Sequence, residues 1–289
     1  MRNVAFFSIM AMLMATSASA ATIYGVNGLA RPLDGPDSLI MFDSSNPEGW
    51  TTIGSMNVNN IGFGGLDFDA EGNLWAYAAF YKSTGGAASG LYRVDPSTGN
   101  ATLQGTPSNQ SLQDLAYNPV DGQMYGVNTQ GVITKLYRVD LTTGGTSLVG
   151  TFTGMPSDQH AMSFAIDSEG YYYVHDLTSE KIFKGNTLAL TELYSLPENT
   201  NYSQGMTIDW AHDDMGYHNA VGQGEYPHYY SRLNTFTTDG SAYVLGPEFG
   251  PELPDGLPQV ECGDLAINPI PEPASLLLLT FAAAVLRRR

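Results

Sequence analysis

Residues 115–127 contain the stretch that decides the fold, because two short strands can be recognised in it. Leu115-Ala116-Tyr117-Asn118 is an apolar run that ends in a polar residue, Gly122 follows in a turn, and Met124-Tyr125-Gly126-Val127 is a second apolar run. Two such runs around a glycine-containing turn are typical of a β-hairpin. The first run recurs around four further apolar residues: Leu66, Phe164, Met206 and Leu265. The five copies lie 49, 49, 42 and 59 residues apart, and periods of this size indicate repeated supersecondary units.

A second hairpin follows the first in each repeat. Leu91-Tyr92-Arg93-Val94-Asp95 leads through a turn that contains Gly99 to Ala101-Thr102-Leu103, and residues 136–149 repeat this arrangement. Weaker versions occur at 39–43, 182–186 and 230–234. Two hairpins give four short antiparallel strands, which is the content of one blade of a β-propeller. The sequence therefore predicts an all-β protein.

The two ends of the repeat region complement each other. The last copy, at 263–268, has no second strand, whereas residues 22–27 near the start resemble residues 123–128. Joining them completes one blade and hides the edges that an open array of sheets would expose. We therefore expect a five-bladed β-propeller over residues 21–270, closed by the N- and C-terminal strands. A sixth blade within 220–262 is the alternative count, and a parallel β-helix fits less well because its repeats are shorter.

Composition agrees with this fold and excludes several functions. The 289 residues include 12 Lys and Arg against 29 Asp and Glu, for a formal charge of −17, which argues against nucleic acid as a partner. Abundant Gly and Tyr with only 14% charged residues favour a turn-rich β protein. The single cysteine, Cys262, rules out an internal disulfide framework. We expect it to be a buried free thiol, with intermolecular pairing as the alternative.

The N-terminal segment has the pattern of a secretory signal peptide. Arg2 is followed by an apolar run at 4–15 and by Ala18-Ser19-Ala20, which has small residues at both recognition positions. We expect residues 1–20 to be removed by cleavage before Ala21. An N-terminal membrane anchor is the weaker alternative, because the apolar run is short.

The C-terminal segment has three features in a fixed order: Pro271-Glu272-Pro273, an apolar stretch at 274–286, and Arg287-Arg288-Arg289. This order resembles the PEP-CTERM sorting signal of Gram-negative bacteria. The resemblance implies that residues 271–289 associate transiently with the membrane and are processed by an exosortase. It also implies secretion across the inner membrane to the cell surface or to an extracellular matrix of polysaccharide. An ordinary tail anchor is the alternative.

The body of the chain also resembles a known group. The signature Leu-Tyr-Arg-Val-Asp-x-x-Thr-Gly occurs at 91–99 and again at 136–144. It resembles secreted propellers of the NHL and YVTN type. The resemblance implies the propeller fold but no single activity, because this fold hosts binding, scaffold and enzymatic roles.

The candidate ligand-binding residues lie in one tyrosine- and histidine-rich segment: Trp210, His212, His218, Tyr226, His228 and Tyr229. His212 and His218 lack the four-residue helical spacing of zinc motifs, and the chain has no nucleophile elbow or Walker loop. We therefore expect a non-catalytic protein that binds extracellular polysaccharide or surface proteins. The alternative is a secreted hydrolase or lyase that acts on glycans through the His212–His228 region.

Aromatic side chains support the sugar hypothesis, because flat amphipathic rings stack on sugars. Tyr171-Tyr172-Tyr173, Tyr226, Tyr229-Tyr230 and Trp210 are the candidates. No cofactor is expected. The polar residues that end the first strands (Asp69, Asn118, Asp167, Asp209 and Asn268) fit turn formation better than a ring of metal ligands. Calcium stays an alternative at 67–73, which has a calcium-like composition but not the spacing of an EF-hand.

Overall fold

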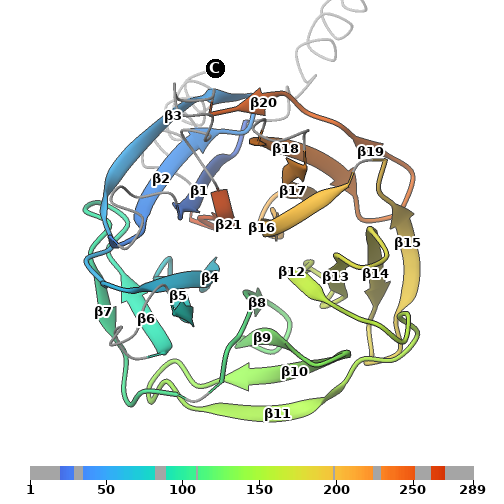
Figure 1. The fold of residues 1–289 in the computed structure, drawn as a ribbon, viewed down its shortest axis with the longest axis horizontal. Helices are drawn as coiled ribbons and strands as arrows, with labels where there is room; N and C mark the ends of the chain where they lie inside the picture. Colours follow the sequence, from blue (N-terminus) through green and yellow to red (C-terminus); the bar gives the residue numbers. More distant parts are fainter. Residues whose placement is uncertain are drawn as a thin grey trace, which may run out of the picture.

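Five four-stranded blades surround a common axis, as Figure 1 shows. The computed structural model describes residues 20–28, 35–81, 89–108, 110–197, 199–223, 229–250 and 262–270. All regular elements within these residues are β-strands, and every strand pairing inside a blade is antiparallel. The predicted five-bladed β-propeller is therefore confirmed. The predicted signal peptide and sorting signal lie outside the described residues.

The blades follow one another along the chain. Blade 1 consists of β21 (Cys262–Ile267), β1 (Thr22–Asn27), β2 (Ser38–Asp43) and β3 (Asn46–Ser55). Blade 2 consists of β4 (Ile61–Phe68), β5 (Leu74–Tyr81), β6 (Gly90–Val94) and β7 (Ala101–Leu103). Blade 3 consists of β8 (Asp114–Asn118), β9 (Gln123–Gln130), β10 (Ile133–Val139) and β11 (Thr146–Thr151).

The other two blades complete the ring. Blade 4 consists of β12 (Ala161–Ile166), β13 (Tyr172–Asp176), β14 (Lys181–Gly185) and β15 (Thr191–Ser195). Blade 5 consists of β16 (Thr200–Ile208), β17 (Met215–Gln223), β18 (Tyr229–Thr237) and β19 (Tyr243–Val244), with β20 (Glu248–Phe249) also paired to β18. The strands within 220–250 thus belong to blade 5 and do not form a sixth blade.

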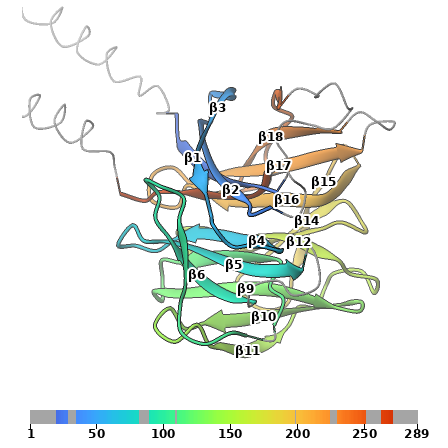
Figure 2. The same ribbon diagram turned by 60° about the vertical axis from the view of Figure 1, so that its left-hand side comes forward.

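The ring closes where the sequence predicts. β21 pairs with β1 in blade 1, with Ile23 opposite Ile267 and Gly25 opposite Leu265. Two segments from opposite ends of the chain therefore share one sheet, and β21 is the strand of that sheet nearest the axis (Figure 1). Figure 2, a view turned by 60°, shows β1 and β2 beside the strands of blade 5. Within the described residues, the inner strand of every blade is paired with the second strand of that blade.

Burial decreases from the axis outward. The inner strands β4 and β12 are buried along their whole length, whereas the outer strand β11 has no buried residue. Aromatic rings fill the spaces between blades: Tyr24 meets Phe68 with ring centroids 5.2 Å apart, and Tyr173 meets Phe236 at 5.9 Å. The hydrophobic contacts that stabilise the fold thus lie between neighbouring sheets, as in other stacked β architectures.

Asp residues at the strand ends form turns, as the sequence indicates. Oδ1 of Asp69 accepts the backbone N–H groups of Glu71 and Asn73 at 3.1 and 2.8 Å. Asp167 does the same in blade 4, where it holds Tyr171 N–H at 2.8 Å. These side chains satisfy backbone donors in the turn, which is the usual role of aspartate at this position. We call the end of the ring that carries these turns the turn face.

Among the residues that the structure describes, no helix is long and apolar enough to span a membrane. Cys262 begins the closing strand and is a fully buried free thiol. Its Sγ lies 3.4 Å from the carbonyl oxygen of Asp264. The expected burial is therefore confirmed.

The buried thiol of Cys262 should be inert in the folded protein. Burial raises its pKa to about 12, so almost no thiolate forms at pH 8, and the thiolate is the reactive species. We expect a thiol-specific reagent to label Cys262 at least about 100-fold faster in denaturant than in native buffer. Mass spectrometry after timed labelling measures both rates. Rapid labelling of native protein would contradict this assignment.

Candidate functional site

The structure gives the predicted ligand-binding residues different environments. Trp210 and His212 lie in the turn after β16, and His218 lies inside β17. Tyr226 and His228 are outside the described residues, and Tyr229 is described only as backbone of β18. The described members of this set therefore do not form one shared site.

His218 is a structural residue between blades 4 and 5. It is fully buried, its Nδ1 lies 2.9 Å from the Tyr243 hydroxyl, and its Nε2 lies 3.1 Å from Oε1 of Gln204. The imidazole ring of His175 lies nearby, with ring centroids 4.8 Å apart and the ring planes tilted by 58°. Burial first, and His175 second, lower the pKa of His218 well below its usual value. His218 therefore stays neutral and unavailable to an external ligand.

His212 is the accessible histidine of the set. Its side chain is 47% exposed, and its Nδ1 lies 2.6 Å from Oδ1 of Asp209, whose side chain is only 9% exposed. Burial raises the pKa of Asp209, and the hydrogen bond with His212 opposes that change. A carboxylate that orients one imidazole nitrogen is a recurrent acid–base arrangement. Oδ2 of the nearby Asp214 binds the hydroxyl of Ser168 at 2.5 Å, so this serine is directed at Asp214.

The predicted sugar-stacking aromatics are partly internal. Tyr173 is fully buried, with its hydroxyl 2.8 Å from Oδ2 of Asp167, so its interpretation as a surface residue is wrong. Trp210 is half-buried and packs on Tyr117 with ring centroids 5.7 Å apart. With Asp67 and inner-strand residues of blades 3–5, Trp210 lines a closed space at the axis. Tyr173 therefore serves packing, because alternate side chains of its strand point between the blades, and Trp210 packs against Tyr117 from the turn after β16.

The axis of the ring holds three buried carboxyl groups: Asp67, Asp114 and Asp264. Two of them connect neighbouring blades, since Asp67 accepts Tyr117 N–H at 2.7 Å and Asp114 accepts Phe164 N–H at 2.6 Å. Burial raises the pKa of Asp67 to about 7, although hydrogen bonds from the backbone N–H groups of Tyr117 and Phe68 oppose the change. Such groups are costly to ionise and are prime candidates for pH-dependent behaviour.

Asp114 and Asp264 form a carboxyl pair across the axis. Each carboxyl group affects the pKa of the other, and a hydrogen bond between them requires a proton on one of the two. Oδ1 of Asp264 accepts Leu265 N–H at 2.8 Å, and its Oδ2 has no hydrogen-bond donor within the described residues. Burial is the largest cause that raises the pKa of both groups. The described ranges contain no cluster of three or more His, Cys, Asp or Glu suited to a metal ion.

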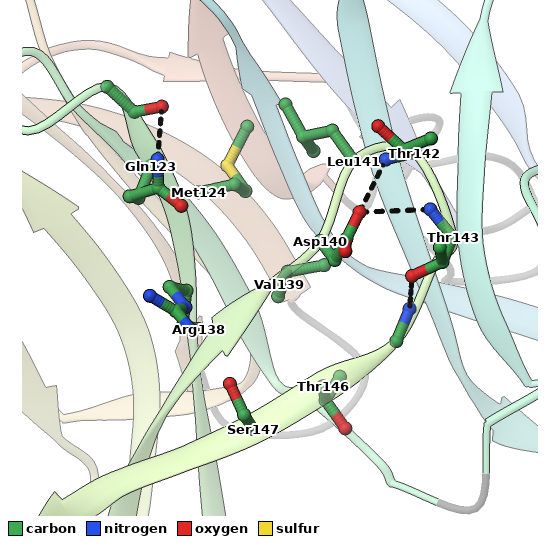
Figure 3. A pocket seen from close by; sticks show the side chains of 12 residues that line it. Gln123, Met124, Arg138, Val139, Asp140, Leu141, Thr142, Thr143, Thr146 and Ser147 are labelled. Carbon is green, nitrogen blue, oxygen red and sulfur yellow. Dashed lines mark hydrogen bonds between the residues drawn. The ribbon is translucent and has the colours of Figure 1, made fainter.

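Two polar grooves lie on the turn face. The first, on blade 3, has a volume of about 590 Å³ and is lined by residues of β9, β10 and β11 and by the turn at 140–145. Figure 3 shows Gln123, Arg138 and Ser147 on neighbouring strands at one side of this groove, with the turn at the other. Asp140 holds that turn through Thr142 and Thr143 N–H, at 2.8 and 3.0 Å.

The second groove is the equivalent site on blade 2, with a volume of about 570 Å³. In blade 2 Arg93 pairs with Trp75 on one side and Thr102 on the other, and in blade 3 Arg138 pairs with Tyr125 and Ser147. Both volumes fall in the range of about 300–1,000 Å³ that is usual for ligand sites. The sequence shows the two arginines as one repeated signature, but it does not show that each signature borders a hollow.

The comparisons with known proteins agree with the fold. Residues 80–221, just under half of the chain, match a family model described as a repeat of unknown function (DUF6923). No protein with a curated description matches the sequence. The match covers all of blade 3 and blade 4, so it supports the repeat organisation without adding an activity.

Solved structures that are similar to this chain come from different kinds of protein. A chain of a nidogen/laminin complex is 11% identical, with a TM-score of 0.51 over 86% of this chain and 98% of that one. TolB from Acinetobacter baumannii is 13% identical, with a TM-score of 0.45 over 86% and 66%. A putative 6-phosphogluconolactonase from Bacteroides uniformis is 14% identical, with a TM-score of 0.43 over 80% and 67%. At such low identity the first likeness shows the β-propeller fold alone, and no argument about function rests on any of them.

Proposed function

We propose that the protein is a secreted, non-catalytic β-propeller that binds extracellular polysaccharide. The observation that carries this proposal is the pair of equivalent grooves on blades 2 and 3. Two copies of one polar site suit a ligand that itself repeats, because one polymer can occupy both. Hydroxyl, amide and charged side chains line the grooves, and such groups exchange hydrogen bonds with sugar hydroxyls.

The predicted termini support an extracellular place of action. A signal peptide at 1–20 and the PEP-CTERM resemblance at 271–289 favour secretion across the inner membrane, transient membrane association and processing by an exosortase. The cell surface or its polysaccharide matrix is then where the propeller meets its ligand. Surface proteins are the alternative partners.

Retention on polysaccharide tests the proposal directly. We expect the purified protein to be retained on immobilised exopolysaccharide from its own source, both with calcium and with a chelator. We expect its elution volume to be at least about tenfold larger than on a column without polysaccharide, as for a site of micromolar affinity. Loss of retention with the chelator alone would show a cation bridge through the acidic surface. Absence of retention under both conditions would contradict polysaccharide binding.

The Asp209–His212 pair favours a second candidate function, the cleavage of glycans by a hydrolase or lyase. If His212 acts as a base, incubation with the polysaccharide must shorten the chains, and His212→Ala must abolish the shortening. On the non-catalytic proposal neither protein shortens them. Size-exclusion chromatography of the polysaccharide before and after incubation distinguishes the two functions.

A further inference from the structure

We infer that the grooves on blades 2 and 3 recognise a carboxylate-bearing polysaccharide, a polyuronate, through Arg93 and Arg138. This inference rests on the proposed polysaccharide binding, and it adds the chemical class of the sugar and the residues that select it.

Half of the described basic residues occupy one position of the repeat. The described part of the chain contains six Lys and Arg, all on the third strands of blades, and three of them lie at equivalent positions: Arg93, Arg138 and Lys184. Each lies opposite an aromatic residue of the second strand and opposite Thr or Ser on the fourth strand. Blades 1 and 5 have Met41 and Thr235 at this position. Positive charge at this position of the repeat is therefore confined to three consecutive blades.

Lys184 differs from the two arginines because its charge is already satisfied. Its Nζ donates to the carbonyl oxygen of Thr238 at 2.7 Å, lies 3.8 Å from Oδ2 of Asp167, and lies 4.4 Å from the centroid of the Tyr171 ring. Within the described residues neither Arg93 nor Arg138 forms an ion pair, and both are exposed. Arg93 donates one hydrogen bond, to Oδ1 of Asn73 at 2.5 Å. Two guanidinium groups thus border the grooves with donors to spare.

The other groups in the grooves point to an acidic sugar. A guanidinium group binds a planar carboxylate with two parallel hydrogen bonds. Beside it, Asp95 and Asp140 are held in their turns by backbone N–H groups, and hydrogen bonds within those turns lower the pKa of both. A carboxylate has about four lone-pair sites, so each aspartate still accepts hydrogen bonds from sugar hydroxyls. A uronate unit offers one carboxylate and neighbouring hydroxyls, whereas a polyphosphate offers only anionic oxygens, which the aspartates repel.

The net charge of −17 does not prevent this contact. At physiological ionic strength the Debye length is about 8 Å, so repulsion from distant surface carboxylates is largely screened while direct contacts persist. Long-range repulsion instead disfavours polyanions that make no specific contact. Because the two grooves lie on adjacent blades, one polymer can bind to both, and the second contact is then intramolecular.

Charge-neutralising variants test the inference. Binding of the full chain to alginate, a polyuronate, and to dextran, a neutral polysaccharide, is measured with a chelator present so that no cation bridges the charges. We expect Arg93→Gln and Arg138→Gln each to weaken alginate binding about tenfold, and the double variant about 100-fold or more. Lys181→Gln removes the same charge at an ion pair with Glu192 and should change binding less than about twofold. Unchanged thermal midpoints show that the variants are folded.

Stoichiometry gives a second readout. Titration with a short uronate oligosaccharide should show two sites per chain, and one site in either single variant. Equal binding of the double variant and the unchanged chain to alginate would overturn the inference, as would equal weakening by Lys181→Gln. If the protein binds dextran or its own polysaccharide but the arginine variants have no effect, the proposed function stands and the inference fails. If it binds no polysaccharide, both fail.

Discussion

Asp264→Asn is expected to raise the thermal midpoint of unfolding at pH 8. In the folded protein Asp264 and Asp114 interact inside the ring, and burial raises the pKa of both. In water both carboxyl groups would be ionised at pH 8. In the folded protein the pair either keeps one proton or carries two neighbouring negative charges, and both states cost folding free energy. Asparagine provides a neutral N–H donor toward Asp114, and its Oδ1 keeps the bond from Leu265 N–H. We expect a gain on the order of 5 °C.

The sign of the pH dependence follows from the direction of each shift. A carboxyl group whose pKa is raised by folding contributes its full stabilisation at pH values below its unfolded pKa of about 3.8. That contribution is lost as the pH rises through the folded pKa. For Asp67, whose pKa is about 7, the loss between pH 4 and 7 amounts to about 4 kcal/mol at most. His218 acts oppositely, because its lowered pKa removes stability as the pH falls below about 6.5.

Thermal midpoints measured from pH 4.5 to 9 check this expectation. The unchanged chain should lose stability as the pH rises, and Asp264→Asn should flatten that decline. Asp95→Asn is the matched control, because this exposed carboxylate has a lowered pKa and its replacement should give no gain at pH 8. An Asp264→Asn protein no more stable than the unchanged chain at pH 8, with the same pH profile, would contradict the shared-proton arrangement.

Gly205→Ala is expected to destabilise the ring strongly. Gly205 lies on β16 against the closing strand, and a Cβ atom there would lie 2.4 Å from Cα of Asp264 and 2.7 Å from N of Leu265. These are backbone atoms, so the strands themselves must separate to accept the methyl group. We expect a loss on the order of 2–4 kcal/mol in the free energy of unfolding.

Gly263→Ala is the matched control for this substitution. Gly263 lies on β21 beside Asp264, but the nearest atom to its added Cβ would be Val26 O at 3.9 Å, an ordinary contact. Denaturant unfolding of both variants measures the difference. Equal stabilities would mean that β16 and β21 are not packed as tightly as described.

The repeat could be predicted from the sequence because its determinants are local. Gly122 and the apolar runs on either side of it fix one hairpin, and the spacing of the copies fixes the number of blades. The missing second strand after Leu265 even predicted how the ring closes. Each of these features depends on residues close together in the chain.

The site could be predicted less well because its determinants are distant contacts. Asp114 and Asp264 meet across the axis although 150 residues separate them, and neither stands out in the sequence. Histidine clustering suggested that His212 and His218 act together, yet one is exposed in a turn and the other is buried between sheets. Arg93 and Arg138 were visible as a repeated signature, but the hollow beside each depends on how three strands end.

The pairing of β1 with β21 determines when the protein can finish folding during its synthesis. Ile23 lies opposite Ile267, 244 residues later in the chain, so the first strand to be made waits for the last. At a synthesis rate of about 5–20 residues per second, this delay is roughly 10–50 s. Until then β1 has a free edge on its inner side, which is open to pairing with other chains. The native ring therefore cannot be completed before β21 has been synthesised, and the nascent chain needs protection from aggregation for that time.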